Sequence, residues 1–234
     1  MIPIKTESAW RGTSDCRNCG IREMVLFADL KEEDFNLIHA PIDDLAYQSG
    51  QSLYEESDKA VGVFTLRKGM VKLVRVTADG RERVVRVLFA GDVVGLEALA
   101  TGRYDSQAVA LSDVSVCRIP LDVIHQLGAN SPRLHHKLME KWQSALRLAD
   151  DWLAELNFGT ARQRVAHFIR KMHEVSGDGT ATLFGRDDMG AMMDIKLETV
   201  SREVTALVRA GVMEPLDKQG RHYAVLRPEL LQET

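Results

Sequence analysis

The three cysteines are the residues of this sequence with the most specific chemistry. Cys16 and Cys19 stand close together in a polar segment near the N-terminus, and Cys117 lies in an apolar, β-branched stretch far along the chain. Thiolates bind soft metals and iron–sulfur clusters, and neighbouring thiols can form a reversible disulfide. An odd, sparse set of cysteines does not suggest a structural disulfide framework. The pattern indicates thiols that are reduced, metal-bound or redox-active, although Cys117 taken alone is more typical of a small buried apolar residue.

A second set of residues has the types and the spacing that read DNA bases. Glu198, Ser201 and Arg202 lie at i, i+3 and i+4, so they share one face if residues 196–209 form a helix. Arg can pair with guanine O6 and N7, Glu can accept from cytosine N4, and Ser can contact base edges or a phosphate. The alternative is a solvated helix face on which Glu198 and Arg202 form an i,i+4 ion pair.

Other kinds of site find little support in the sequence. The histidines are scattered, and no glycine-rich phosphate loop or nucleophile elbow occurs, so we predict a protein that is not an enzyme. With 30 Lys and Arg against 34 Asp and Glu, the net charge of -4 excludes a polycation that coats nucleic acid by charge alone. Neither a signal peptide nor an apolar run of membrane-spanning length is present, which predicts a cytoplasmic protein without a membrane partner.

Short β-branched runs separated by glycines predict an antiparallel sandwich or barrel in the first half of the chain. The runs are Val61–Leu66, Val71–Val76, Val84–Phe89 and Val114–Cys117. Strand patterns end at equally spaced glycines, namely Gly69, Gly80, Gly91 and Gly102. Among these turns, Asp79-Gly80 is the clearest hairpin signal.

A long helix is expected after Ser131, a suitable N-cap, and Pro132, a suitable first helical residue. Six apolar residues then recur at steps of four and three, the seam of a coiled coil: Leu138, Trp142, Ala145, Ala149, Trp152 and Leu156. A second apolar line repeats every seven residues and is expected to rest on the chain's own β-domain: Met139, Leu146 and Leu153. Two buried faces predict a dimerisation helix, and the alternative is an amphipathic helix packed inside one monomer.

The last part of the chain predicts a small helical domain with one β element. Helices are expected at 161–175, 186–192 and 196–209, and Asp194 lies where a helix-turn-helix needs a residue that tolerates positive φ. Residues 212–216 and 221–226 predict two strands around a glycine turn, which would form a wing. The expected domains are a cysteine-containing arm (1–26), a β-roll sensor domain (27–130), a dimerisation helix (131–157) and a DNA-binding domain (158–234).

In this order of elements and in several strings, the sequence resembles the CRP/FNR family of transcription regulators, most closely its FNR branch. The strings are Gly91-Asp-Val-Val-Gly95 followed by Ala98-Leu99, Ser112-Asp-Val-Ser-Val-Cys117 leading to Ile119-Pro120, and Leu197-Glu-Thr-Val-Ser-Arg202. The resemblance spans nearly the whole chain. It implies an α+β fold with an N-terminal antiparallel β-roll of the cyclic-nucleotide-binding, jelly-roll type, a long dimerisation helix and a C-terminal winged helix-turn-helix.

The resemblance also implies a function and its partners. It assigns base reading to Glu198, Ser201 and Arg202, and therefore a homodimer on palindromic double-stranded DNA with TTGAT-like half-sites. It further implies an activator that contacts RNA polymerase. Five residues are candidates for contacts to the DNA backbone, which position a domain without specifying sequence: Lys196, Thr199, Arg186, Lys218 and Arg221.

The sensor is where the sequence departs from the family. Cys16, Cys19 and Cys117 match three cysteines that hold an iron–sulfur cluster in FNR, but the remaining position is Val25, which cannot bind iron. Three hypotheses stay open: a cluster with a substitute ligand, a dithiol switch or another metal on Cys16 and Cys19, and thiols without a sensing role. The carboxylates near the missing ligand are Glu23, Asp15 and Asp29.

Cyclic-nucleotide binding is not expected, because the residues that grip the ribose and the phosphate in CRP-type β-rolls are absent. Gly95 is followed by Leu96, and the phosphate-grip positions are Ser106-Gln107. A fixed cation for the phosphate is therefore missing. The alternative to a redox or oxygen sensor is a regulator that works without effector or responds to haem or another small molecule.

Overall fold

The computed structural model describes residues 26–27 and 42–232, and these fall into two compact units. One unit contains residues up to 75 together with 85–147, and the other contains residues 76–84 and 148–234. Several residues of the predicted sensor lie outside the described residues, namely Cys16, Cys19, Val25, Glu23, Asp15 and Asp29.

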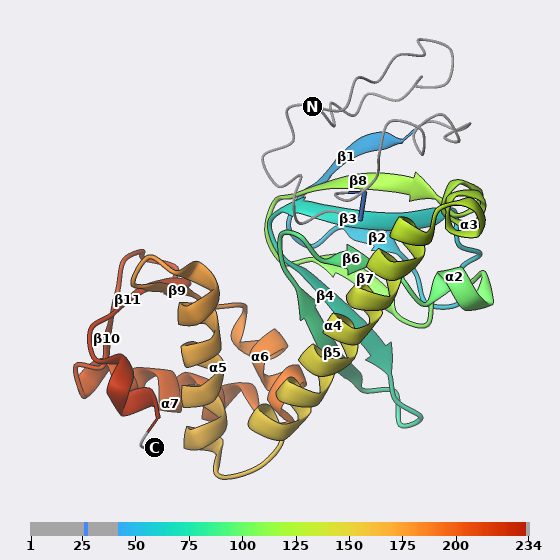
Figure 1. Ribbon diagram of the computed structural model, residues 1–234. Helices are drawn as coiled ribbons and strands as arrows, with labels where there is room; N and C mark the ends of the chain where they lie inside the picture. Colours follow the sequence, from blue (N-terminus) through green and yellow to red (C-terminus); the bar gives the residue numbers. More distant parts are fainter. Residues whose placement is uncertain (1–25, 28–41, 233–234) are drawn as a thin grey trace. The chain divides into compact units, whose positions relative to one another are not determined.

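The first unit is built on two antiparallel four-stranded sheets (Figure 1). One sheet has the order β1-β8-β3-β6, with β1 Asp43–Tyr47, β8 Val114–Pro120, β3 Gly62–Lys68 and β6 Val93–Val94. The other has the order β2-β7-β4-β5, with β2 Ser52–Tyr54, β7 Gln107–Ala110, β4 Val71–Val76 and β5 Glu82–Leu88. The predicted β-branched runs are confirmed as β3, β4, β5 and β8. The four equally spaced glycines all have positive φ, as turns of this kind require.

Side chains alternate between two hydrophobic clusters along the strands of the first sheet. Phe64, Leu66 and Val116 face the second sheet, in a cluster that includes Leu73 and Ala108. Val63 and Ile119 point the other way, toward the apolar residues of α3 (Leu121–Asn130) and the start of α4. The short helix α2 (Ala98–Thr101) precedes β7. The sheet is therefore buried on both faces, and α3, which the sequence analysis did not predict, covers the outer one.

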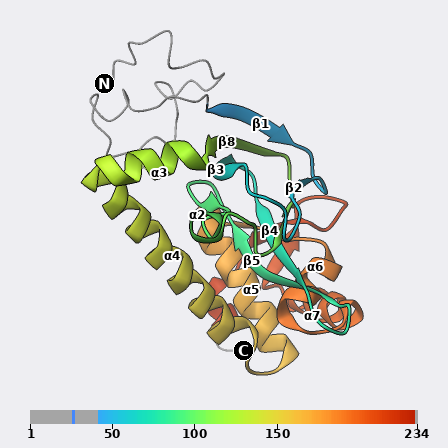
Figure 2. The same cartoon turned by 90° about the vertical axis from the view of Figure 1, so that its right-hand side faces the viewer.

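The long helix α4 runs from Pro132 to Leu156 and begins at the predicted residue. Ser131 has an extended backbone between α3 and α4, and Figure 2 shows the bend between the two helices. A proline disfavours helical geometry at the residue before it, which here is Ser131. The sequence therefore predicts a bend between the two helices at this point.

The second unit contains the predicted helices and the predicted wing. Its elements are α5 (Ala161–Ser176), β9 (Thr180–Thr182), α6 (Arg186–Met193), α7 (Leu197–Arg209), β10 (Met213–Pro215), β11 (His222–Val225) and the 3-10 helix η2 (Pro228–Leu231). The strand order is β10-β11-β9, and β9 was not predicted. A capping box between Thr160 and Gln163 starts α5. Phe168 is fully buried in this unit and meets Trp152 of α4 edge-on.

Candidate nucleic-acid interface

The turn between α6 and α7 sets the direction of the predicted recognition helix. Asp194 has φ 53°, the left-handed conformation that was expected for it. Gly190 lies so close to the next segment that a Cβ there would come within 2.6 Å of the Ile195 carbonyl oxygen. A positive φ at one position and a missing side chain at the other therefore allow the tight approach of α7 to α6.

Helix α7 has a buried face and an open face. Val200, Val204 and Leu207 are buried in the domain. On the other side, Glu198 and Arg202 are exposed and Ser201 is half-buried, so the structure brings the three predicted base-reading residues together on one surface. Because the buried side fixes the rotation of the helix, this surface is the one that α7 offers to a ligand.

Arg202 pairs with Glu203, whereas the alternative of a solvated helix face predicted a pair with Glu198. Its Nε lies 3.3 Å from Oε1 of Glu203, and its side chain is 69% exposed. The pair with Glu203 leaves both terminal nitrogens of the guanidinium available, which are the atoms that pair with guanine. The Glu203 side chain is 16% exposed, but the Arg202 side of the pair lies in solvent; such a pair is weak, so it can rearrange on contact with a ligand.

A hollow on the open face extends further along α7 than predicted. It is lined by Ser201, Arg202, Thr205, Ala206 and Arg209. The hydroxyl of Thr205 donates to the Ser201 carbonyl at 2.8 Å, which turns the donor back onto the helix. Arg209 was missed by sequence reasoning, although its position seven residues after Arg202 is a signal that both share a face.

The five residues predicted to contact the DNA backbone differ in their exposure and in their contacts within the protein. Lys196, Lys218 and Arg221 are exposed, and Thr199 is half-buried. Lys218 and Arg221 lie in the turn between β10 and β11, the tip of the wing. Arg186 instead donates hydrogen bonds to the wing itself, at the Gly220 carbonyl and the Tyr223 hydroxyl.

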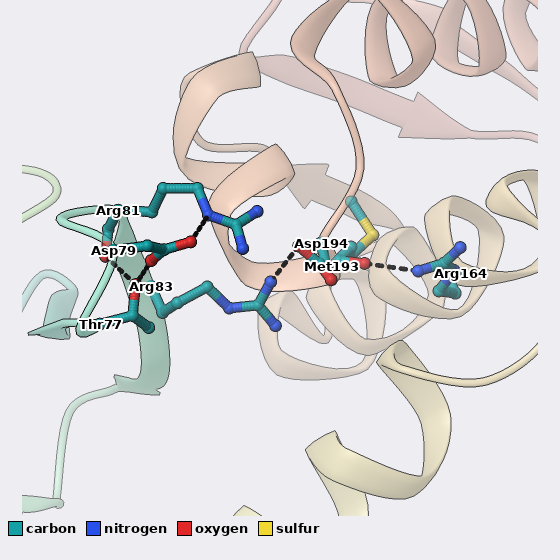
Figure 3. A network of polar contacts seen from close by, with 7 residues as sticks. All are labelled: Thr77, Asp79, Arg81, Arg83, Arg164, Met193 and Asp194. Atoms are coloured by element: carbon teal, nitrogen blue, oxygen red, sulfur yellow. Dashed lines mark hydrogen bonds and ion pairs between the residues drawn. The ribbon is translucent and has the colours of Figure 1, made fainter.

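The turn after α6 is supported by two arginines that sequence reasoning missed (Figure 3). Arg83, the second residue of β5, forms an ion pair with Asp194, and both residues belong to the second compact unit. Arg164 of α5 donates from Nη1 to the carbonyl of Met193 at 2.7 Å. Neither pairing has a local sequence signal, because the partners are far apart along the chain.

The tip of the β4–β5 hairpin, which precedes Arg83, is ordered by its own polar contacts (Figure 3). Asp79 accepts from Thr77 Oγ1 at 2.5 Å and from Arg81 Nε at 2.7 Å. These hydrogen bonds lower the pKa of Asp79 to about 2. The N–H of Gly80 donates to the Thr77 carbonyl at 2.8 Å, which confirms the turn predicted from Asp79-Gly80.

Cys117 is held as a thiol and not as a ready metal ligand. Its Sγ donates to Oδ1 of Asp44 at 3.3 Å, and the same carboxylate oxygen is 2.8 Å from Nη1 of Arg67. Burial first, and then the hydrogen bond to Asp44, raise the pKa of the thiol to about 11. The described part of the chain contains no group of three or more His, Cys, Asp or Glu side chains placed to hold a metal ion. The other two predicted ligands, Cys16 and Cys19, lie outside the described residues.

Two tyrosine rings fill the β-roll beside Gly95. Tyr54 and Tyr104 stack with ring centroids 3.6 Å apart, and a Cβ on Gly95 would come within 2.9 Å of the Tyr104 ring. The Tyr104 hydroxyl donates to the Gly62 carbonyl at 2.7 Å. Ser106, at a predicted phosphate-grip position, is buried. That cyclic nucleotide does not bind stays a prediction, and this packing supports it.

The burial of the α4 side chains corrects the prediction of which apolar line of the helix is open to a partner. Leu138, Trp152 and Leu156 of the predicted seam are buried inside the chain, so they are not available to a partner. The line that was expected to rest on the β-domain is instead exposed: Met139 50%, Leu146 65% and Leu153 58%, with Trp142 at 40%. The two apolar lines are only one residue, about 100°, apart, so periodicity does not say which of them faces inward. We call Met139, Trp142, Leu146 and Leu153 the α4 stripe.

Within residues 26–27 and 42–232, no helix combines enough length with enough apolar character to cross a bilayer.

Comparison with known proteins matches both halves of the chain. A cyclic nucleotide-binding domain model matches residues 45–131, and a Crp-like helix-turn-helix domain model matches residues 163–234. The fumarate nitrate reduction regulatory protein of Klebsiella oxytoca is 26% identical over 92% of this chain and 88% of its own length. The fumarate and nitrate reduction regulatory protein of Escherichia coli (strain K12) is 25% identical over 85% and 82%, respectively.

Solved structures have the same fold. FixK2 from Bradyrhizobium japonicum has a TM-score of 0.75 and 26% identity, and the match covers 82% of this chain and 96% of that chain. A CRP-family transcriptional regulator from Thermus thermophilus, TTHB099, has a TM-score of 0.67 and 20% identity, with 81% and 95% covered. The matched domains and relatives are those of transcription regulators and not of enzymes. Because both domain models match in the order that the fold shows, and relatives align along most of its length, the chain belongs to the CRP/FNR family of transcription regulators, near the FNR branch.

Proposed function

We propose that the chain is a homodimeric, sequence-specific DNA-binding regulator that reads a palindrome of TTGAT-like half-sites with α7. The observation that carries the proposal is the division of α7 into a buried face and an open face with Glu198, Ser201 and Arg202. Family membership supports DNA as the ligand. In helix-turn-helix proteins, such a face lies in the major groove and its N-terminal residues contact base edges.

Titration of a labelled duplex by fluorescence anisotropy tests the reading of sequence. We expect Arg202→Ala to lose about 1–3 kcal/mol of discrimination at a single guanine of each half-site. Lys218→Ala should instead weaken binding to all sequences alike and reduce the slope of log K against log salt by about 0.9 per half-site, or about 1.8 for the homodimer on the palindrome. If Arg202→Ala binds the palindrome and its mismatched variants as the wild type does, Arg202 does not read a base.

For dimerisation, we propose the α4 stripe as the contact between two copies. It supplies apolar residues at steps of three, four and seven that are left uncovered in the single chain: Met139, Trp142, Leu146 and Leu153. Ala149 lies between Leu146 and Leu153 on the same line and is half-buried. This stripe takes the place of the seam that was predicted one residue away.

For the signal, we propose a redox or oxygen response centred on Cys16 and Cys19. The support is the pair itself and the similarity to fumarate and nitrate reduction regulatory proteins. Cys117 does not take part as a preformed thiolate, because its hydrogen bond to Asp44 and its raised pKa keep the proton on sulfur. The alternative is a regulator without effector, or one that responds to haem or another small molecule.

Absorption spectra with iron and sulfide analysis, on protein purified without oxygen and then exposed to air, separate these hypotheses. A visible band that bleaches in air, with iron and sulfide present, indicates a cluster, and a sharp Soret band indicates haem. Colourless protein whose Cys16 and Cys19 lose two free thiols with a disulfide oxidant indicates a dithiol switch. Cys16→Ser/Cys19→Ser should abolish the response and Cys117→Ser should not; the reverse result contradicts the proposal.

We also propose that the dimer acts in the cytoplasm and activates transcription through contact with RNA polymerase. Family membership is the support for this step. Transcription in vitro from a promoter that carries the palindrome should rise when the protein is added. Unchanged or reduced transcript from an occupied promoter would contradict activation there.

A further inference from the structure

Among the residues predicted to contact the DNA backbone, Arg186 has its charged group engaged by the protein itself. Its Nη2 donates to the Gly220 carbonyl at 3.0 Å and to the Tyr223 hydroxyl at 2.9 Å. The guanidinium carbon also lies 6.0 Å from the centroid of the Tyr223 ring. Arg186 is the first residue of α6, whereas both partners lie in or beside the wing. One side chain thus joins the start of the helix-turn-helix to the wing.

The wing turn is also joined to β9 and the residue after it, where the N–H of Leu183 donates to the Arg221 carbonyl at 2.7 Å and Thr182 Oγ1 lies 3.1 Å from His222 Nδ1. Within the turn, Asp217 accepts hydrogen bonds from the N–H groups of Arg221 at 3.0 Å and His222 at 3.1 Å, which lowers the pKa of Asp217. The N–H of Leu216 donates to the His222 carbonyl at 2.8 Å. None of these bonds links the turn to a residue of α6. Arg186 provides such a link, and its partner Tyr223 is only 5% exposed.

From these contacts we infer that Arg186 is a positioning residue that holds the wing tip so that Lys218 and Arg221 reach the DNA backbone. The inference rests on the proposed DNA-binding function. A planar guanidinium can bond two acceptors and stack on an aromatic ring at the same time, whereas a lysine ammonium keeps the charge without this geometry. Arg186 therefore acts through the wing, and its own charge is directed at protein oxygens and not at a phosphate.

A double-mutant cycle with Lys218 separates this role from a direct phosphate contact. Arg186→Ala should raise the Kd for a palindromic duplex about tenfold, near the low end for loss of a hydrogen bond to a charged group. In that background Lys218→Ala should have almost no further effect, because the displaced wing no longer brings Lys218 to the DNA. If the two effects multiply independently, Arg186 contacts the DNA by itself and the inference is overturned.

Two further variants distinguish geometry from charge. Arg186→Lys keeps the charge and should bind as weakly as Arg186→Ala, whereas full rescue by lysine would overturn the inference. Tyr223→Phe removes one acceptor without changing any charge, and we expect its Kd to rise about threefold. An unchanged Kd for Tyr223→Phe, beside a weakened Arg186→Ala, would also contradict a role through the wing.

Hydrogen exchange on the free protein tests the positioning role without DNA. The N–H groups of Arg221 and His222 should exchange faster in Arg186→Ala, while those in the middle of α5 keep their protection. Unchanged exchange at the wing would overturn the inference even if DNA binding falls. If the wild-type chain binds no duplex at all, the proposed function fails, and the exchange result still decides whether Arg186 holds the wing.

Discussion

Cys117 is positioned by residues from two neighbouring strands of its sheet. Asp44 on β1 lies opposite Cys117 on β8 in the strand register, and Arg67 comes from β3 on the other side. A carboxylate beside a thiol opposes loss of the proton, since thiolate and carboxylate would repel each other. Arg67 offsets part of this repulsion but does not reverse it, because the net shift of the thiol pKa is upward. At this residue, burial and charge both favour an inert thiol.

Cys117 should therefore react slowly in the folded protein. With the pKa of the thiol raised from 9.0 to about 11, the thiolate fraction at pH 8 falls about a hundredfold relative to the unfolded chain. The raised pKa stabilises the fold below about pH 9, and this contribution is lost as the pH rises through about 11. Iodoacetamide labelling followed by mass spectrometry should show slow modification of Cys117 in native protein and fast modification in urea. Asp44→Asn should label faster than wild type, and equal native and unfolded rates would contradict this account.

Asp194 carries the backbone conformation that the helix-turn-helix needs. Its φ of 53° costs a residue with an ordinary side chain about 1–2 kcal/mol, and Asn and Asp adopt it more readily. Asp194→Ala and Asp194→Asn both lose the ion pair with Arg83, so their difference isolates the backbone term. We expect the alanine variant to be about 1 kcal/mol less stable than the asparagine variant in urea unfolding. Equal stability would mean that the turn relaxes without strain.

The role of a single residue could be predicted from the sequence when its partners lie close to it along the chain. The positive φ of Asp194 and of Gly80 followed from the sequence, because turn chemistry is decided by a few neighbouring residues. Arg186 was expected at a phosphate, and its contacts to Gly220 and Tyr223 could not be foreseen. Bonds between residues far apart in sequence depend on the packing of whole elements, about which local patterns say little.

At the scale of elements, α4 shows what the period of apolar residues can predict about a helix and what it cannot. The apolar steps along the helix predicted its existence, Ser131 and Pro132 predicted its start, and the structure confirms both. They also predicted two apolar faces, but not which of them the chain buries itself. Trp152 and Leu156 are covered by the chain, while Leu146 and Leu153 are left open. The choice is made by α5 and by the outer sheet face, which the sequence of α4 does not contain.

Leu146 provides a direct test of the α4 stripe. Leu146→Glu would bury a carboxylate in an apolar contact, so we expect the dissociation constant of the dimer to rise at least about a hundredfold. Sedimentation velocity over a range of concentrations measures this change. Ser144→Glu is the matched control, because Ser144 is exposed and lies about 200° around the helix from Leu146. Dissociation caused equally by both variants, or by neither, would contradict the stripe as the interface.

For the molecule as a whole, the order of patterns along the chain predicted the architecture. Period-two runs with regular glycines indicated the β-roll, period-3.5 apolar steps the long helix, and turn signals the winged helix-turn-helix, as the structure and both domain models confirm. The contact of Arg83 in β5 with Asp194 in the turn after α6 had no such signal. The predicted cysteine arm lies outside the described residues, so the sensor remains a proposal from sequence.

Dimerisation and DNA reading should be coupled in the whole protein. A two-fold symmetric dimer places two copies of α7 on one side of the duplex, with half-sites about 10 base pairs apart from centre to centre. Once one copy is bound, the other binds as a tethered group, which raises the affinity for a full palindrome by a factor of about 100 or more over a single half-site. Neither copy of α7 changes its own contacts in this process.

Leu146→Glu should therefore lose the advantage of the palindrome and keep the affinity for a half-site. About five base pairs inserted between the half-sites turn one of them to the opposite side of the duplex, and we expect the same loss for wild-type protein on that DNA. Anisotropy titrations with the palindrome, the half-site and the lengthened palindrome measure all three affinities. Because each half-site keeps its sequence, a wild-type affinity that the insertion leaves unchanged would mean that the two copies are not coupled through α4.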